Sequence, residues 1–401
     1  MAEFRPWIGI ATTRLPDVAA KSRPAHRPAV HFCRIAEEAN RLGARVVLFI
    51  PKDVRWKKRE VYGWVPVSPN DPFGNWTKRI VPLPNVFYEN VYVHLSVSGY
   101  SEELRRMARQ NNLPLFNPIM PGKWQMVRLL KQSIHKDYLP PTEQLTDVRR
   151  AASLIQEWKV AYVKPSGGYG GNGVTRVEYL RDGNFRMSID RINGKVKGIR
   201  EVISNAELLR RLARRKQPLH LVQKGIDLMT VGGRRLDFRV VVHRDGEGKW
   251  QLIGIVPKQA AADGVVTNLI AGGERLSLER AILMARREGK RLPVRELSEC
   301  AINVATLLSQ RNSHVGLAGF DLGVDKDGKV WVIEMNPKPA RSLMTAEMRA
   351  TLAKTQAQFA VWLAKHPQQV RESPLHRSRT TKIPGPEQTV RPRNARLVEM
   401  L

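Results

Sequence analysis

The sequence predicts an α+β protein in which a small α/β unit precedes a larger α+β unit and a basic tail. Three observations carry this prediction. The chain begins with a strand–helix–strand pattern, its middle alternates apolar runs of strand length with amphipathic helices, and its end is poor in apolar residues. With 401 residues, 42% of them hydrophobic, the chain can form two or three domains with substantial cores. We expect domains at residues 1–120 and 121–365, followed by a flexible tail at 366–401.

The first unit is predicted from two apolar runs that flank an amphipathic segment. Residues 7–11 are typical of a strand, 28–42 of a helix and 45–50 of a buried strand, which favours an open α/β arrangement. The stretch that follows is rich in Pro, Trp and Asn. Its expected elements are strands at 64–67 and 80–83, a helix at 101–111 and a short strand at 113–116. Pro118, Pro121 and Gly122 then interrupt regular structure, so we place the domain boundary at 117–122.

The larger unit is predicted to mix antiparallel strands with helices. The expected helices lie at residues 123–134, 147–158, 205–216, 277–289, 295–310 and 344–365. The expected strands lie at 160–164, 174–180, 185–190, 195–203, 219–223, 235–243, 250–257, 318–323 and 329–336. The last two strands should form a hairpin across Asp325-Lys-Asp-Gly328, because Asp-Gly is a strong turn signal. From residue 366 the chain is rich in Pro, Arg, Ser and Thr, which is typical of a flexible segment.

Composition excludes several classes of protein. There is no apolar run of 18 residues, so we expect no transmembrane helix, and the first residues lack the features of a signal peptide. We therefore expect a cytoplasmic protein. Cys33 and Cys300 lie in helical patterns and are interpreted as buried thiols rather than a disulfide. The nine histidines show no metal-type spacing, and neither a nucleophile elbow nor a Walker lysine occurs.

A formal net charge of +30 is spread along the whole chain. Basic runs recur, as in Arg55-Trp-Lys-Lys-Arg59 and Arg210-Arg-Leu-Ala-Arg-Arg-Lys216. Such a surface attracts polyanions such as RNA, anionic lipid or an acidic polymer. The alternative is a general basic bias that only solubilises the protein, and the sequence contains no RNA-binding motif that would decide between the two.

One segment combines a lysine with a glycine-rich loop. Lys164 ends the apolar run Val160-Ala-Tyr-Val163, and Pro-Ser-Gly-Gly-Tyr-Gly-Gly-Asn-Gly-Val174 follows it. Glycines let backbone N–H groups converge on phosphate oxygens without Cβ clashes, and Lys164 would neutralise phosphate charge. Alone, the loop could equally be the mobile tip of a hairpin. Lys123 is a second candidate for a phosphate contact, with a solvated lysine at a helix start as the alternative.

A second segment carries oxygen ligands. Glu334 and Asn336 end the apolar run Val330-Trp-Val-Ile333, and side chains two residues apart on a strand point to the same face. Asp321, on the other strand of the predicted hairpin, can face Glu334. Three oxygen donors would suit Mg2+, with positions left for phosphate and water. The alternative is an acidic pair on a solvated face, but both carboxylates lie within apolar runs, where a cation or an arginine is expected.

Weaker candidates lie on the intervening strands. Asp237-Phe-Arg239 places an acid and a base on one strand face, either as a structural ion pair or to deliver Arg239 to a transferring phosphate. Lys258 and Asn268 are candidates for phosphate contacts, and Arg341 could meet an anionic substrate.

These residues, in this order along the chain, resemble an ATP-grasp domain. The resemblance rests on the following positions: Lys123, Tyr162 to Val174, Gln223-Lys-Gly225, Asp237-Phe-Arg239, Asn268 to Gly273, Asp321 and Glu334-Met-Asn336. More narrowly, residues 5 to 365 resemble the YheC/YheD family of endospore-coat-associated ATP-grasp proteins, including its N-terminal α/β unit. The resemblance implies two α+β lobes that grip ATP, with Mg2+ (or Mn2+) as the metal.

The resemblance also implies roles by position. Lys123 and Lys164 would contact phosphates, and Ser166, Gly167, Gly168, Tyr169, Gly170, Gly171 and Gly173 would form the lid loop. Gln223, Lys224, Gly225 and Ile226 would be the hinge whose backbone meets adenine. Asp321, Glu334 and Asn336 would hold the metal, and Arg239, Lys258 and Asn268 would lie by the γ-phosphate or acyl group. ATP-grasp hinges often present a glutamate where Gln223-Lys224 stands here, and Asp227 would substitute for it.

The resemblance implies a ligase that activates a substrate carboxylate as an acyl phosphate, which an amine or a thiol then attacks. Two other functions stay open at this point. One is a structural or assembly protein of the spore coat that binds nucleotide without turnover, and the other is an RNA- or anionic-polymer-binding protein. Coat proteins or an anionic polymer would then be partners of the basic surface, and the family's location would be the mother-cell cytoplasm or the spore coat.

Overall fold

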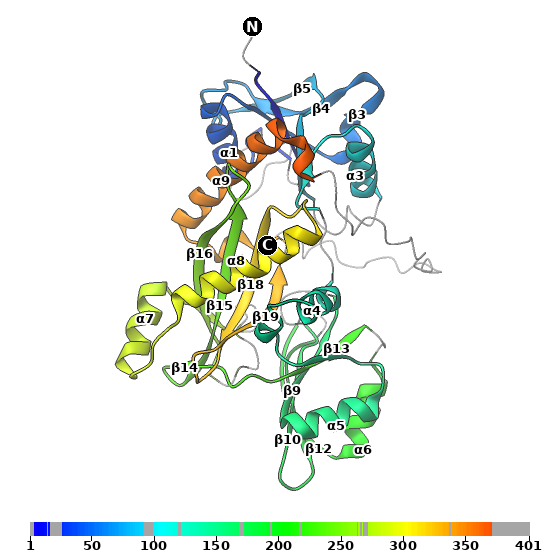
Figure 1. Ribbon diagram of the computed structural model, residues 1–401, viewed down its shortest axis with the longest axis vertical. Helices are drawn as coiled ribbons and strands as arrows, with labels where there is room; N and C mark the ends of the chain where they lie inside the picture. The colour runs from blue at the N-terminus through cyan, green and yellow to red at the C-terminus, as the bar shows by residue number, and fades with distance from the viewer. Residues whose placement is uncertain are drawn as a thin grey trace.

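A computed structural model describes most of the chain, and Figure 1 shows its arrangement. The described residues are 4–13, 15–16, 26–91, 99–118, 122–167, 172–192, 195–215, 219–262, 264, 267, 272–336 and 338–370. Within them the strands form three sheets, which follow one another along the long axis of the molecule. The helices and sheets mix as the sequence predicts, so the α+β class is confirmed.

The N-terminal sheet has a parallel centre and an antiparallel edge. Its strands are β1 (Trp7–Thr12), β2 (Arg45–Phe49), β3 (Val54–Arg55), β4 (Glu60–Pro66), β5 (Trp76–Pro82), β6 (Val86–Asn90) and β7 (Leu115–Phe116). The order is β3-β4-β2-β1-β6-β7, with β5 paired to β4. β1 runs parallel to β2 and β6, and β6 parallel to β7. Helix α1 (Val30–Arg41) covers one face, and α3 (Tyr100–Gln110) covers the other.

The sequence did not predict β6, although this strand lies in the centre of the sheet. All five of its residues, Val-Phe-Tyr-Glu-Asn, are buried. A parallel strand that is covered on both faces shows no alternation of polar and apolar residues, and the Glu-Asn end hides the apolar run. Glu89 is nevertheless paired, since its carboxylate accepts two hydrogen bonds from Arg105 at 2.6 and 2.7 Å.

The second sheet is antiparallel and carries the glycine-rich segment. Its order is β12-β11-β10-β9-β13-β8. Its strands are β8 (Thr142–Gln144), β9 (Val160–Pro165), β10 (Thr175–Tyr179), β11 (Phe185–Ile192), β12 (Lys195–Ile203) and β13 (His220–Lys224). Helices α5 (Val148–Trp158) and α6 (Asn205–Ala213) fill its core. Both helices begin at a capping side chain, because Asp147 and Ser204 accept hydrogen bonds from first-turn N–H groups.

The third sheet carries the acidic candidates. Its order is β17-β16-β15-β18-β19, with β14 paired to β15. Its strands are β14 (Thr230–Val231), β15 (Arg234–Arg244), β16 (Trp250–Gln259), β17 (Glu274–Arg275), β18 (Leu317–Val324) and β19 (Val330–Asn336). One face packs against α4 (Lys123–Lys131), α7 (Leu278–Arg287) and α8 (Val294–Arg311). The predicted hairpin is present, since Gly328 has a φ of +85° and donates to Asp325 O.

Helix α9 (Ala346–Lys365) connects the third sheet to the N-terminal sheet. Met348 and Leu352 pack with Val241 of β15, whereas Phe359 and Leu363 belong to the core of the N-terminal unit. A sequence pattern locates such a helix but cannot assign it to one core. The domain limits therefore remain a prediction, and α9 contributes to the cores on both sides.

Other differences are small. Helix α4 ends at Lys131 rather than at 134, and α9 begins after the capping side chain of Thr345. The sequence did not predict β3, β8, β14 and β17, which are three residues long or shorter. Such strands depend on a neighbouring strand for their hydrogen bonds, and their own sequence carries little signal. Cys33 and Cys300 are both buried thiols, as predicted.

Candidate active site

Lys164 joins the second and third sheets. It lies near the end of β9, only 7% exposed, and its Nζ donates to Gln223 Oε1 on β13 at 2.7 Å. The same Nζ donates to the carbonyl oxygen of Ile333 on β19 at 3.2 Å. Burial lowers the pKa of Lys164 to about 8, and the nearby Lys123 adds to this, while Glu334 and Asp321 act against it. The glycine-loop strand and the predicted metal-binding strand therefore meet at one lysine.

Lys123 extends this junction to α4. It is the first residue of α4, its N–H donates to Ser166 O at 3.3 Å, and its Nζ lies 3.3 Å from Glu334 Oε1. The Lys123 side chain is only 14% exposed. Lys123 is therefore not a solvated lysine at a helix start, which was the alternative. Two lysine ammonium groups thus lie beside one carboxylate.

Only the two ends of the glycine loop lie in the described part of the chain. Gly168, Tyr169, Gly170 and Gly171 lie outside it, whereas Ser166, Gly167 and Gly173 are within it. Gly173 has a φ of +73°, a backbone conformation that glycine adopts without strain. Its carbonyl accepts from Arg215 Nη1 at 3.4 Å, and Arg215 Nη2 donates to Thr175 Oγ1 at 2.7 Å. Arg215 was not predicted, because in the sequence it is one of several arginines in a basic helix.

The predicted hinge begins with the last two residues of β13 and continues to Ile226. Gln223 turns its side chain towards Lys164, and its Nε2 donates to Thr142 Oγ1 at 2.9 Å. The N–H groups of Lys224 and Gly225 donate to Pro141 O and Val160 O. A Cβ on Gly225 would lie 2.5 Å from Val160 Cγ1, so only glycine fits there. Ile226 and Asp227 lead on to the third sheet, where Asp227 O accepts from Lys326 N.

Asp321 lies at the centre of a buried ionic cluster on the third sheet. Arg239 donates to it in a bidentate pair, with Nε–Oδ1 and Nη2–Oδ2 distances of 2.9 Å. Lys258 Nζ donates to Oδ1 at 2.9 Å, and Asn336 Nδ2 to Oδ2 at 3.3 Å. Burial alone would raise the pKa of Asp321, but Arg239 and Lys258 outweigh it and hold that pKa below its usual range. The four acceptor positions of the carboxylate are thus all used.

Asp237 has a different set of partners from the one that the sequence suggested. Its carboxylate lies 2.9 Å from Lys258 Nζ and accepts a hydrogen bond from the Thr267 hydroxyl. Arg239 pairs with Asp321 on the neighbouring strand, and no ion pair joins it to Asp237 among the described residues. Burial raises the pKa of Asp237, which Lys258 offsets only in part. Asp237 and Arg239 are thus two residues apart on β15, as predicted, but each forms its ion pair with a residue on a neighbouring strand.

The three predicted metal ligands lie together on the β18–β19 hairpin. Asp321 and Glu334 are paired in register, as predicted, and Asn336 follows two residues later on the same face. Because Asn336 gives its amide N–H to Asp321, its carbonyl oxygen is left for a cation. Glu334 is 25% exposed at the side chain. This donor set fits Mg2+, which prefers carboxylate and amide oxygens. No group of three or more His, Cys, Asp or Glu residues suited to a metal occurs in the described residues.

The remaining predicted residues are Asn268 and Arg341. Asn268 lies outside the described residues. The guanidinium carbon of Arg341 lies 5.9 Å from the ring centre of Phe32 on α1, at the N-terminal unit. Lys338, which the sequence did not single out, is half-buried in the same region and donates to Val91 O at 2.8 Å. Its burial lowers its pKa to about 8. The sequence signal that could have identified Lys338 is its position two residues after Asn336, the last predicted metal ligand.

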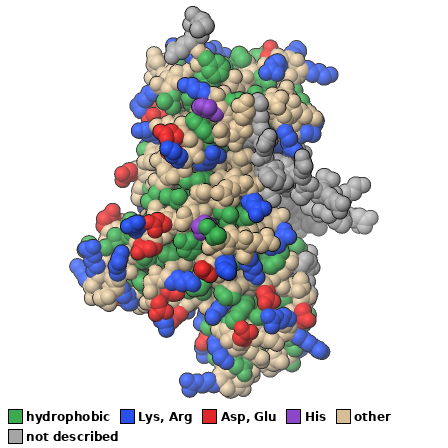
Figure 2. Space-filling view, viewed as in Figure 1, with side chains coloured by type: hydrophobic (Ala, Val, Ile, Leu, Met, Phe, Trp, Pro, Cys, Tyr) green, Lys and Arg blue, Asp and Glu red, His purple; other side chains and the backbone are tan. Residues whose placement is uncertain are grey.

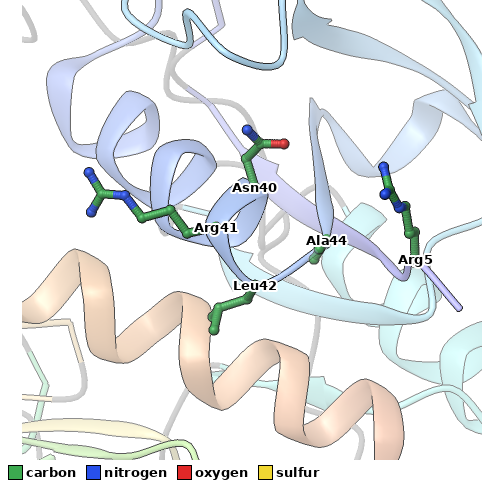
Figure 3. A pocket seen from close by; sticks show the side chains of 6 residues that line it. Arg5, Asn40, Arg41, Leu42 and Ala44 are labelled. Atoms are coloured by element: carbon green, nitrogen blue, oxygen red, sulfur yellow. The ribbon is translucent and has the colours of Figure 1, made fainter. Parts of the chain in front are cut away.

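The surface shows no grouping of candidate residues as dense as the buried cluster among the described residues. Figure 2 shows Lys and Arg side chains spread over this face with Asp and Glu among them, and a basic group over α7. A shallow hollow of about 420 Å³ lies between the start of β1 and the α1–β2 loop. Its lining includes Arg5 and Arg41, whose side chains point apart in Figure 3. This hollow lies at the amino end of β1, whereas Lys338 meets the residue after the carboxyl end of β6, so the two are at opposite edges of the sheet.

A family model described as YheC/D-like ATP-grasp matches residues 112–363. The chain belongs to this family. Its ATP-grasp fold accounts for the second and third sheets, with the Lys164 junction between them. Among the described residues, no helix is both long and apolar enough to cross a membrane.

Two relatives from Bacillus subtilis (strain 168) are similar over most of the chain. The endospore coat-associated protein YheD is 26% identical over 355 residues, which cover 85% of this chain and 74% of YheD. The endospore coat-associated protein YheC is 20% identical over 316 residues, which cover 78% of this chain and 85% of YheC.

Two solved structures match this chain over most of its length. A Chryseobacterium gregarium RiPP-associated ATP-grasp ligase has a TM-score of 0.47 at 12% identity, over 89% of this chain and 97% of that one. N5-carboxyaminoimidazole ribonucleotide synthetase from Thermotoga maritima has a TM-score of 0.45 at 13% identity, over 88% and 76%. Neither similarity speaks to the activity of this chain.

Proposed function

We propose that this protein is an ATP- and magnesium-dependent ligase that joins a carboxylic acid to an amine or a thiol. The observation that carries the proposal is the hydrogen bond from Lys164 Nζ to Ile333 O, at 3.2 Å. This bond joins β9, which leads into the glycine-rich segment proposed to bind phosphate, to β19, which carries Glu334, across 169 residues of the chain. A nucleotide and its metal ion need both halves in one place.

Within this proposal the lysines bind the nucleotide and the hairpin binds the metal. Lys123 and Lys164 neutralise phosphate charge beside Glu334. Glu334 and Asn336 would present oxygens to Mg2+, and Asp321 would add a third oxygen if Lys258 or the Asn336 amide released its hydrogen bond to the carboxylate. Bound Mg2+ supplies charge neutralisation for the phosphoryl oxygens. Arg239 and Lys258, held by buried carboxylates, are oriented to stabilise the phosphoryl group or the acyl oxygen.

The proposed reaction needs no nucleophile from the protein. A substrate carboxylate oxygen attacks the γ-phosphorus of ATP, the bond to the bridging oxygen breaks, and ADP leaves with its electrons. The amine nitrogen or thiol sulfur then attacks the acyl carbon, phosphate leaves, and the proton of the nucleophile passes to solvent. The chain's residues bind, orient and stabilise charge in both steps.

Glu334→Ala tests the site. We expect it to lose magnesium-dependent ADP binding by at least about tenfold, because a metal ligand is worth ~1.4 kcal/mol or more. The fold should stay intact, since the Glu334 side chain is partly exposed. Calorimetric titration with ADP, with and without Mg2+, measures the effect, and the exposed Glu279→Ala on α7 serves as control. Unchanged magnesium-dependent affinity would remove Glu334 from the site.

Turnover is tested by ADP release from ATP in the presence of pools of acids and amines, followed by mass spectrometry of the products. Tight MgATP binding with no turnover on any pool would contradict the ligase function.

That outcome would support a second function, a nucleotide-binding assembly protein of the spore coat. The names of both relatives, which are endospore coat-associated proteins, favour this alternative. For the ligase, the same names lead us to infer that it acts in the mother-cell cytoplasm or in the coat.

A further inference from the structure

The N-terminal sheet changes its winding direction between β1 and β6. From β1 the chain passes through α1 to β2 on one side, and from β6 it passes through α3 to β7 on the other side. The two helices cover opposite faces of the sheet. In open α/β sheets, ligands bind beyond the carboxyl ends of the strands at such a switch point. The topology therefore marks the edge formed by the ends of β1 and β6 as a binding position.

The segment that follows the predicted metal ligands runs to this same edge. Pro339 packs on Gly319, where a Cβ would lie 2.7 Å from Pro339 Cβ and 3.5 Å from Arg239 Cδ. Lys338 reaches the carbonyl of Val91, the residue after β6. Arg341 reaches Phe32 in the first turn of α1. A few residues thus connect the Arg239–Asp321 cluster to the switch point.

Within the described part of the chain, positive charge gathers at the start of α1 with no carboxylate paired to it. Ala29 precedes the helix and provides no capping side chain, and no acidic residue stands in the first turn. Burial and then the Arg341 and Arg34 guanidinium groups lower the pKa of His31. Neither arginine has an ion pair among the described residues. The first N–H groups of a helix together with free guanidinium groups attract an oxyanion.

A buried polar atom without a partner lies at the same edge. Asn90 ends β6, is 5% exposed, and accepts from the Tyr88 hydroxyl at 3.4 Å through Oδ1. Its Nδ2 is buried with no acceptor among the described residues. Gln356 of α9 fixes Tyr88 through a hydrogen bond of 2.9 Å. A buried donor without an acceptor costs about 1–3 kcal/mol, so such a group usually has a partner in the functional state.

We propose that this edge binds a second anionic group of the acid substrate, a carboxylate or a phosphate, on Arg341, the start of α1 and the Asn90 amide. The proposal rests on the ligase function proposed above, in which the reacting carboxylate lies by Arg239 and the metal. The acid substrate is then a small dianion, with one end at the third sheet and the other at the N-terminal unit.

Kinetics with paired acids test this. ADP release is measured at saturating MgATP and amine pool with dicarboxylic, phosphorylated and monocarboxylic acids of matched length. We expect turnover with a dianionic series and little with the monoanions. Arg341→Gln should raise the KM for the dianion at least about tenfold with kcat little changed, because binding to a distant group is lost. Arg341→Lys should restore part of it, and the exposed Arg280→Gln on α7 should have no effect. Equal use of monoanions, or an unchanged KM in Arg341→Gln, would overturn the proposal.

A second experiment, which measures binding without turnover, tests this proposal independently of the ligase function. Thermal unfolding is followed with succinate, citrate or inorganic phosphate at constant ionic strength, with MgADP as a separate ligand. We expect one of the three anions to raise the melting temperature of the wild type and not of Arg341→Gln, while MgADP stabilises both. Comparison of the anions shows whether carboxylate or phosphate is preferred. An equal effect of the anions on both proteins, or no effect on the wild type, would show that the edge holds no anion, whatever the outcome for turnover.

Discussion

Asp321 shows how single residues determine the chemistry of this site. Its carboxylate is surrounded by Arg239, Lys258 and Asn336, and all of its acceptor positions are used. A buried carboxylate needs such partners, since the desolvation cost would otherwise be several kcal/mol. If Glu334 and Asn336 bind a metal ion, as proposed, that ion would reach Asp321 only by replacing one of these donors.

His243 predicts a dependence of stability on pH. Its ring is fully buried at edge-on contacts with Phe116 and Phe359, and burial lowers its pKa to about 4 from an ordinary 6.5. Between pH 6.5 and pH 4 the histidine binds a proton in the unfolded state but not in the folded state. Stability is therefore full above pH 6.5 and is lost as pH falls towards 4, by up to about 3 kcal/mol. Urea unfolding at several pH values measures it.

The control for this prediction is a comparison of two histidine variants. His243→Leu should reduce the dependence between pH 6.5 and 4 without removing it, because the pKa of His31 is also lowered by burial, whereas His366→Leu, at the exposed end of α9, should keep the full dependence. Equal slopes for wild type and His243→Leu would contradict the assignment to His243.

Lys164 predicts a dependence of nucleotide affinity on pH. Its pKa of about 8 means that the ammonium charge is present below pH 8 and lost above it. The affinity for MgADP should fall as pH rises through 8, because the neutral amine no longer attracts phosphate. Lys164→Met should bind at least about tenfold more weakly at pH 7 and lose this dependence. Titration calorimetry from pH 6.5 to 9 measures both, with the exposed Lys249→Met as control. A variant that keeps the wild-type pH profile would rule out Lys164.

At the scale of elements, the β18–β19 hairpin positions both the carboxylates and the segment behind them. Gly319 is paired with Asn336 in the register, and the Pro339 ring packs where its side chain would be. The close approach of these two segments lets residues 338–341 pass from the third sheet to the N-terminal unit. Strand pairing thus sets the positions of the proposed metal ligands, and the close packing at Gly319 sets the path of the segment that follows them.

Gly319→Ala tests this packing. The added Cβ would lie 2.7 Å from Pro339 Cβ, and a proline ring cannot rotate away. We expect the free energy of unfolding to fall by about 1–3 kcal/mol, the usual cost of overpacking. Urea denaturation measures it. Gly246→Ala is the matched control, because its nearest neighbour would be Gln358 Cβ at 3.4 Å. A loss no larger than the control's would show that the segment shifts freely.

At the scale of the whole molecule, α9 makes the N-terminal and third sheets interdependent. Ala353, Phe359 and Leu363 of α9 are fully buried with Ile10 and Phe32 of the N-terminal unit. The same helix packs on β15 through Met348. The first 120 residues therefore lack part of their core when they stand alone.

A fragment of residues 1–120 should for this reason fail to fold. We expect no near-ultraviolet circular dichroism and no cooperative urea transition, because the face that α9 covers would be exposed to water. The full chain without residues 371–401 keeps α9 and should unfold like the full chain. Cooperative unfolding of the fragment would show that the N-terminal unit is an independent domain.

Several features followed from the sequence alone because their causes are local. The Asp-Gly turn and the apolar runs beside it place Asp321 opposite Glu334, and the register confirms this. Alternating patterns and capping residues gave the helices to within a few residues. The ordered motifs also indicated the ATP-grasp family. Local hydrogen bonding and side-chain periodicity are sufficient for such features.

The partners were decided only by the tertiary structure. Arg239 pairs with Asp321 rather than Asp237, Gln223 with Lys164, and Lys338 with Val91 O, each across at least 59 residues of chain. Which of many cations reaches a buried carboxylate depends on how the sheets and α9 pack, and no local pattern encodes that choice. Sequence fixes which chemical groups are present, whereas packing selects which of them share a low-dielectric interior.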